Sequence, residues 1–75
     1  MSRKLPMLKA RDIIHVLRLL GFSETRQTGS HIFFTHLDGR TTLVPRHGNE
    51  DIGRGLLRQI MREIEITPDQ FSKYL

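Results

Sequence analysis

Apolar residues recur every three or four positions between Ala10 and Leu20, which is the spacing of one face of an amphipathic helix. They are Ala10, Ile13, Ile14, Leu17 and Leu20, with Val16 beside them. Gly21 is placed to end this helix. Polar residues, among them His15, occupy the opposite side at helical spacing, so we expect His15 to face solvent.

The pattern then changes to that of β-strands. Phe22–Thr28 has a strand pattern, and Gly29 separates it from Ser30–His36, which is rich in aromatic and β-branched residues. Asp38-Gly39 is a strong signal for a two-residue hairpin turn, and Arg40–Val44 follows as a third strand. Three strands in this order predict an antiparallel meander.

The length of the turn decides which residues of the last two strands face each other. With a two-residue loop, Phe34 lies opposite Leu43. The faces then consist of Ile32, Phe34 and Leu43 on one side, and His31, Phe33 and Val44 on the other. A three-residue loop changes the pairing, so the sequence leaves open which face meets the helices.

A polar loop and a second helix follow the sheet. Pro45 ends the third strand, and Arg46–Asp51 is polar. Apolar residues then recur at helical spacing within Gly53–Ile64. One edge of this helix carries a basic stripe with members four residues apart, namely Arg54, Arg58 and Arg62. The stripe is either a solvated face or a surface that contacts phosphate.

The last segment is a short helix. Thr67 and Gln70 have the spacing of a capping box, with Pro68 at the first helical position. Phe71 and Leu75 are the expected anchors in the core. The order of a helix, three strands, a helix and a short helix predicts an α+β fold with the helices packed on one face of an antiparallel sheet.

Composition limits what this chain can do. Its 75 residues suffice for one compact domain, 1–75. No segment reaches the roughly 18 apolar residues of a membrane span, and Met1–Lys9 leads into no signal-peptide core because Arg11 and Asp12 interrupt the run. The lack of cysteine excludes disulfides, thiolate catalysis and Cys-ligated zinc, and we expect a cytoplasmic protein.

The charge balance favours a polyanionic partner. Twelve Lys and Arg residues against eight Asp and Glu residues give a net charge of +4, and basic side chains bind nucleic acid by releasing counterions from phosphate. Nucleic acid is the leading expectation for the partner and an acidic protein the second, and the alternative to both is a merely soluble basic domain. The four histidines have no metal-ligand spacing, and nucleotide-binding motifs are absent, so we expect neither a metal nor a small-molecule cofactor.

The segment Arg26-Gln27-Thr28-Gly29-Ser30-His31 places a histidine at the start of a strand, directly after a glycine corner. It resembles the glycine-serine-histidine motif of the HicA toxins, the small ribonucleases of bacterial and archaeal toxin–antitoxin pairs. Other segments in the family's order and spacing are Leu20-Gly21-Phe22, Asp38-Gly39-Arg40, Val44-Pro45-Arg46-His47 and Gly55-Leu56-Leu57 with Ile60. The resemblance covers most of the chain.

This resemblance implies a fold like that of double-stranded-RNA-binding domains, cleavage of mRNA without a metal, and inhibition by a HicB-type antitoxin that covers the active site. Two positions depart from the family pattern. Leu37 stands where these toxins commonly have proline, and Glu65 stands where glycine commonly ends the second helix. Glu65 therefore has to adopt a left-handed backbone conformation, at a cost of about 1 kcal/mol.

Under this resemblance His31 is the catalytic residue. Imidazole titrates near neutral pH, so His31 can take a proton from the ribose 2′-hydroxyl or give one to the leaving 5′-oxygen. His47 is the first candidate for a second proton-transfer group and His36 the next, although both also suit ordinary turn or loop positions. With a two-residue turn, Arg46 lies opposite His31, where a guanidinium stabilises charge on the phosphate. The residues expected to contact RNA are Arg26, Ser30, Arg46, Arg54, Arg58 and Arg62, of which Arg26 and Arg46 are also possible auxiliary catalytic groups.

Two other functions compete with the toxin ribonuclease. The same fold can bind RNA by shape and phosphate contacts without cutting it, or its open sheet face can dock a protein. Substitution of His31 distinguishes the first of these from the enzyme, because a non-catalytic module loses only affinity. Salt-dependent RNA binding separates both from a protein-binding domain.

Overall fold

The computed structural model describes residues 5–75, so the first four residues of Met1–Lys9, the segment considered for export, lie outside it. The elements in chain order are β1 (Leu8–Lys9), α1 (Ala10–Leu19), β2 (Ser23–Thr28), β3 (His31–Thr35), β4 (Thr41–Pro45), β5 (Asp51–Ile52), α2 (Arg54–Ile64) and α3 (Pro68–Ser72). None of the helices described is long and apolar enough to cross a membrane.

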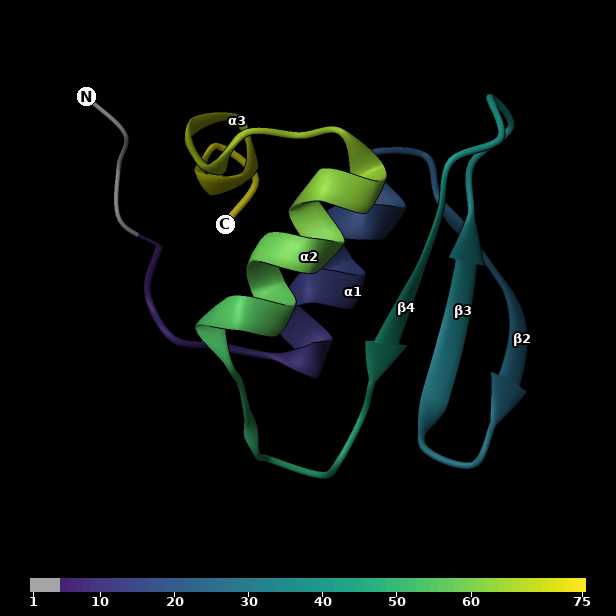
Figure 1. Ribbon diagram of the computed structural model, residues 1–75, viewed down its shortest axis with the longest axis horizontal. Helices are drawn as coiled ribbons and strands as arrows, with labels where there is room; N and C mark the ends of the chain where they lie inside the picture. The colour runs from purple at the N-terminus through teal and green to yellow at the C-terminus, as the bar shows by residue number, and fades with distance from the viewer. Residues whose placement is uncertain (1–4) are drawn as a thin grey trace.

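The expected α+β arrangement is confirmed. Strands β2, β3 and β4 form an antiparallel meander in that order. Both α1 and α2 lie against β4, and β2 lies at the edge of the sheet farthest from them (Figure 1). All six residues of β2 are accordingly exposed, so the sheet projects beyond the helices that cover it.

The hairpin between β3 and β4 has a three-residue loop in place of the predicted two-residue turn. The amide of His36 donates to the carbonyl of Arg40 at 2.8 Å, which leaves residues 37–39 in the loop. Gly39 ends the loop with a φ of 100°, a left-handed conformation that glycine adopts without steric strain. A three-residue loop with glycine at the left-handed position is a common hairpin connection.

This loop shifts the strand register by one residue, so the predicted pairing is wrong. Phe34 pairs with Thr42 in place of Leu43, and Leu43 pairs with Phe33. The face toward the helices carries the buried side chains Ile32, Phe34, Thr42 and Val44, and the open face carries His31, Phe33, Leu43 and Pro45. The face that meets the helices, which the sequence left undecided, is therefore that of Phe34.

The helices bury the faces predicted for them. The core includes Ala10, Ile13, Ile14, Val16 and Leu17 from α1, and Leu57, Ile60, Met61 and Ile64 from α2. His15 is exposed, as expected. Helix α2 begins at Arg54, one residue later than predicted, because Gly53 has the extended conformation of an N-cap residue.

The C-terminal helix confirms one predicted anchor and not the other. The capping box is present, with the Thr67 hydroxyl accepting from the Gln70 amide and the Gln70 side chain accepting from the Thr67 amide. Phe71 is fully buried, but Leu75 is 52% exposed. Because α3 ends at Ser72, Leu75 lies beyond the single turn that orients side chains toward the core.

Helix α2 ends as the sequence requires. Glu65 has φ 59° and ψ 43°, which is left-handed, and it is the one residue other than glycine with a positive φ in residues 5–75. The amide of Ile66 donates to the carbonyl of Met61 at 3.1 Å. This bond closes the Schellman motif that glycine more often completes.

A second, two-stranded pairing was not predicted. Strand β1 pairs antiparallel with β5, with Leu8 opposite Ile52 and Lys9 opposite Asp51. The Lys9 ammonium lies 3.0 Å from the Asp51 carboxylate and donates to the Asn49 carbonyl at 2.6 Å. These contacts fix the end of the loop between β4 and β5.

Candidate functional site

A tight turn places His31 at the start of β3. Thr28 pairs with His31, which leaves Gly29 and Ser30 as the two residues of the turn. Gly29 has a φ of 58° and Ser30 does not have a positive φ, as in a type II′ hairpin turn. The Gln27 side chain donates to the Gly29 carbonyl at 3.2 Å. The imidazole of His31 is exposed on the open face directly after this turn.

The chain brings a second histidine to the same place. Pro45, the last residue of β4, pairs with His31, and His47 follows two residues later in an exposed loop. The ring centroids of His31 and His47 lie 6.4 Å apart, and the ring planes meet at 82°. Two solvent-accessible imidazoles therefore lie side by side.

Arg26 extends this group along the sheet. The register of β2 against β3 shifts at a bulge between Glu24 and Arg26, so that Arg26 pairs with Phe33. Its guanidinium carbon lies 4.4 Å from the centre of the Phe33 ring. Since Thr28 pairs with His31, Arg26 is the diagonal neighbour of His31 on the sheet.

A two-residue turn would place Arg46 opposite His31, but Arg46 does not lie there. Its amide donates to the Ser30 carbonyl at 2.6 Å, and Pro45 takes the place opposite His31. The three-residue loop causes this shift of one position. Arg46 and Ser30 still adjoin His31 through the chain and through this hydrogen bond.

His36 lies at the other end of β3 and does not join the histidine pair. It lies five positions after His31 along extended chain, a distance of about 17 Å. Its ring packs edge-on against Phe22, with centroids 5.1 Å apart. Its Nδ1 accepts a hydrogen bond from the amide of Asp38 at 3.1 Å. His36 therefore has a structural role at the hairpin tip.

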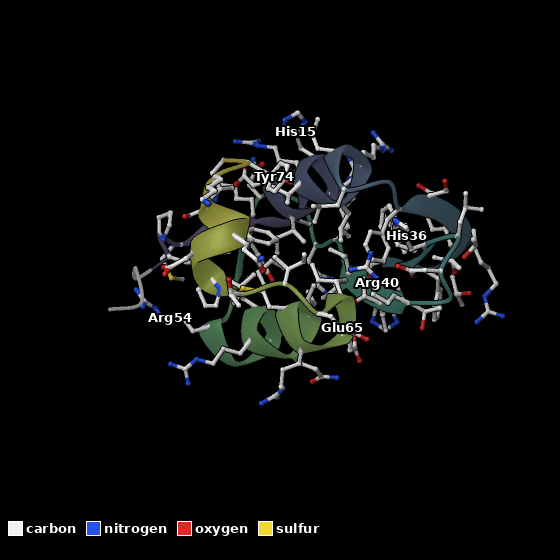
Figure 2. All side chains as sticks on the ribbon, turned by 90° about the horizontal axis from the view of Figure 1, so that it is seen from above. His15, His36, Arg40, Arg54, Glu65 and Tyr74 are labelled. Atoms are coloured by element: carbon white, nitrogen blue, oxygen red, sulfur yellow. The ribbon has the colours of Figure 1, made fainter. Side chains whose placement is uncertain are left out.

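The tip is held by Arg40, which points toward the end of α2 near Glu65 (Figure 2). The Arg40 guanidinium donates to both carboxylate oxygens of Asp38 and to the carbonyl of Ile64, and it lies 5.1 Å from the centre of the Phe22 ring. The hydrogen bond from the Arg40 side chain lowers the pKa of Asp38 below its ordinary value. We call Phe22, His36, Asp38 and Arg40 the hairpin clasp.

The basic stripe lies on α2 and not on the sheet that carries His31. Arg54, Arg58 and Arg62 are all exposed, as predicted. Arg54 lies toward the end of the molecule away from the three-stranded sheet (Figure 2). Arg58 and Arg62 line a separate groove where α2 meets α3, which contains no residue of the sheet.

Sequence reasoning missed the surroundings of the histidine pair. A shallow groove on the open face contains Phe33, Leu43 and Arg26. The signal for it was present in the aromatic pair Phe33-Phe34, but the assumed turn length placed Leu43 on the wrong face. Within residues 5–75, no three histidine, aspartate or glutamate side chains come together as metal ligands.

The sequence matches the model of a known family. The family model described as the HicA toxin of bacterial toxin–antitoxin systems matches residues 10–66, which is more than half of the chain. The matched region contains β2, β3, β4 and both histidines of the pair. A comparison with curated proteins gives no match.

Proposed function

Because the chain belongs to the HicA toxin family of bacterial toxin–antitoxin systems, we propose that it is an endoribonuclease that cleaves mRNA with His31 as a general acid or base. The observation that carries this proposal is the exposed pair His31 and His47, whose rings lie 6.4 Å apart. A HicB-type antitoxin is the proposed protein partner.

Two imidazoles supply the proton transfers that RNA cleavage needs. One takes the proton of the ribose 2′-hydroxyl while its oxygen attacks phosphorus, so that the bond from the 2′-oxygen to phosphorus forms. The other gives a proton to the 5′-oxygen as its bond to phosphorus breaks. The products are a 2′,3′-cyclic phosphate and a 5′-hydroxyl. His31 and His47 fill these two roles without a metal ion.

Cations near the pair stabilise the charge that develops on phosphate. Arg26 is the diagonal neighbour of His31. The backbone amide of Arg46 donates a hydrogen bond to the carbonyl of Ser30, the residue before His31. Ser30 offers a hydroxyl beside the same phosphate. The exposed stripe of Arg54, Arg58 and Arg62 contacts RNA farther from the cleaved bond in this proposal, and each phosphate contact adds salt-dependent affinity.

Cleavage of a defined mRNA tests the proposal. Purified wild-type protein and His31→Ala are incubated with the RNA in excess EDTA, and the fragments are mapped with their end groups. Cleavage by the wild type alone, giving cyclic phosphate ends, supports a metal-independent ribonuclease centred on His31. If both proteins bind the RNA and neither cuts it, the chain is a non-catalytic RNA-binding module. If the protein shows no salt-dependent affinity for RNA, the protein-binding function replaces both the ribonuclease and the RNA-binding module.

The partner is tested with the same assay. The open face that carries His31 has partly exposed apolar side chains, Phe33 and Leu43, which a protein can cover together with the histidines. A purified HicB-type antitoxin is expected to abolish cleavage at a one-to-one ratio. Cleavage that persists in a formed complex contradicts a partner that covers the site.

A further inference from the structure

A shallow groove runs along the open face of the sheet, from the pair Phe33 and Leu43 toward the hairpin tip. It encloses about 470 Å³, which is within the range of about 300–1,000 Å³ found for small-ligand sites. Phe33 and Leu43 are paired within it and supply its apolar surface. Its polar lining on the same face consists of Thr25, Arg26, Thr35 and Thr41.

One carboxylate also lines the groove. Glu63 of α2 accepts a hydrogen bond from the Thr42 hydroxyl at 2.7 Å and one from the Gln59 side chain at 3.4 Å. Both carboxylate oxygens are therefore engaged. Arg26, by contrast, forms no ion pair with any residue in the range 5–75, so its positive charge is available to a ligand.

The contact between Arg26 and Phe33 is readily exchanged. The guanidinium lies over the Phe33 ring at 4.4 Å, but a cation–π contact at an exposed position is weak. A flat aromatic ligand can take the place of the guanidinium on the ring, because bases stack on aromatic side chains in many RNA-binding proteins. The displaced guanidinium is then free to bind a neighbouring phosphate.

Phe33 and His31 are close enough to bind one nucleotide. They are two residues apart on the same face of β3, a separation of about 7 Å along the strand. A phosphate beside His31 therefore places an adjoining base within reach of the Phe33 ring.

We propose that Phe33 stacks on the unpaired base adjoining the scissile phosphate, and that the substrate is therefore single-stranded RNA. This inference rests on the proposed function, because His31 marks the phosphate that is cleaved. A base in a duplex is enclosed by its neighbours in the stack, so it does not lie flat on a sheet. The net charge of +4 and the unpaired Arg26 favour RNA over a protein as the ligand of the groove.

An abasic scan tests the stacking contact. A single-stranded RNA with one cleavage site is compared with copies that each lack one base near that site. For the wild type, one abasic position beside the cleaved bond is expected to lower kcat/KM by at least about fivefold, the effect of losing one stacked base. Phe33→Leu is expected to show the same decrease in kcat/KM already on the intact RNA. Removal of the base beside the cleaved bond is then expected to cause no further decrease for this variant. Phe33→Tyr keeps an aromatic ring and is expected to retain the loss at that abasic position.

A binding measurement separates this inference from the proposed function. Fluorescence anisotropy is measured for His31→Ala, with and without Phe33→Leu, on the intact, abasic and fully paired RNAs. The His31→Ala protein is expected to bind the intact single strand at least about fivefold more tightly than the abasic strand, and this result supports stacking even if the wild type never cuts RNA. Equal affinity for the intact and abasic strands overturns the stacking proposal, even if cleavage by His31 is established.

Two further outcomes bear on the proposal. If Phe33→Leu leaves RNA affinity unchanged and weakens only the complex with an antitoxin, the groove is a protein surface and the proposal is wrong. Tighter binding of the paired RNA than of the single strand is equally decisive against it. Phe33→Met, which also keeps apolar bulk, replaces Phe33→Leu if circular dichroism shows that the leucine variant does not fold.

Discussion

The rings of His31 and His47 meet edge to face, with centroids 6.4 Å apart and planes at 82°. His31 lies at the start of β3, and His47 lies in the loop after β4. Pro45, which pairs with His31, precedes His47 by two residues. The hairpin turn before His31 and the β1–β5 pairing after His47 each fix one member. The geometry of the pair therefore depends on backbone features that can be altered one at a time.

We expect His31→Ala and His47→Ala each to lower kcat for RNA cleavage by about 10²- to 10⁴-fold, the usual contribution of a general acid or base. Steady-state cleavage of a defined single-stranded RNA gives the measurement. The matched control is His15→Ala, because His15 is exposed on α1 (Figure 2). An unchanged kcat for His47→Ala would show that His47 transfers no proton.

Two glycines should respond in opposite directions to alanine. Gly29 has a φ of 58°, so Gly29→Ala is expected to destabilise the fold by about 1 kcal/mol and to reduce cleavage by displacing His31. Gly55 is helical, and a Cβ there meets open space. Gly55→Ala is expected to stabilise the fold by up to about 1 kcal/mol. Urea unfolding of both variants measures these effects, and destabilisation by both would refute the backbone argument.

The left-handed residue at the end of α2 offers a stabilising substitution. Glu65 adopts φ 59° although it has a side chain, which costs about 1 kcal/mol that glycine does not incur. Glu65→Gly is therefore expected to raise the free energy of unfolding by about 0.5–1 kcal/mol. Thermal unfolding gives the measurement, and Glu65→Ala serves as the control because alanine keeps the steric cost. Equal melting temperatures for the glycine and alanine variants would contradict the explanation.

The hairpin clasp should make stability depend on acid pH. The Arg40 side chain lowers the pKa of Asp38 in the folded state, and a carboxyl group of this kind stabilises the fold above its unfolded pKa. That contribution is lost as the pH falls below about 4 and through the folded pKa. Urea midpoints for the wild type and Asp38→Asn are expected to differ at neutral pH and to converge in acid. A difference that stays constant with pH would exclude this role for Asp38.

The sequence predicted the helices because periodicity reports burial over many residues. It could not give the hairpin register, since Asp38-Gly39 suits both a two-residue turn and the end of a three-residue loop, and one added residue changes every pairing. Strands of two residues, as in β1 and β5, are too short to show a period. Leu75 looked like an anchor because its residue type is apolar, but α3 ends before it.

The positions of the two histidines were predicted better than those of the residues around them. His31 and His47 both follow from their place in the motifs, and the structure brings their rings together. The predicted place of Arg46 was wrong by one residue because it depended on the turn length. The pairing of Arg26 with Phe33 depends on a bulge in β2, and no local pattern in the sequence indicates where that bulge lies.

The pairing of β1 with β5 has a consequence for genetics. Lys9 and Ile52 lie outside the sheet that carries His31, yet Lys9 holds the carbonyl of Asn49, two residues after His47. In cells selected for survival during expression of this toxin, inactivating changes are therefore expected at these two positions as well as at His31.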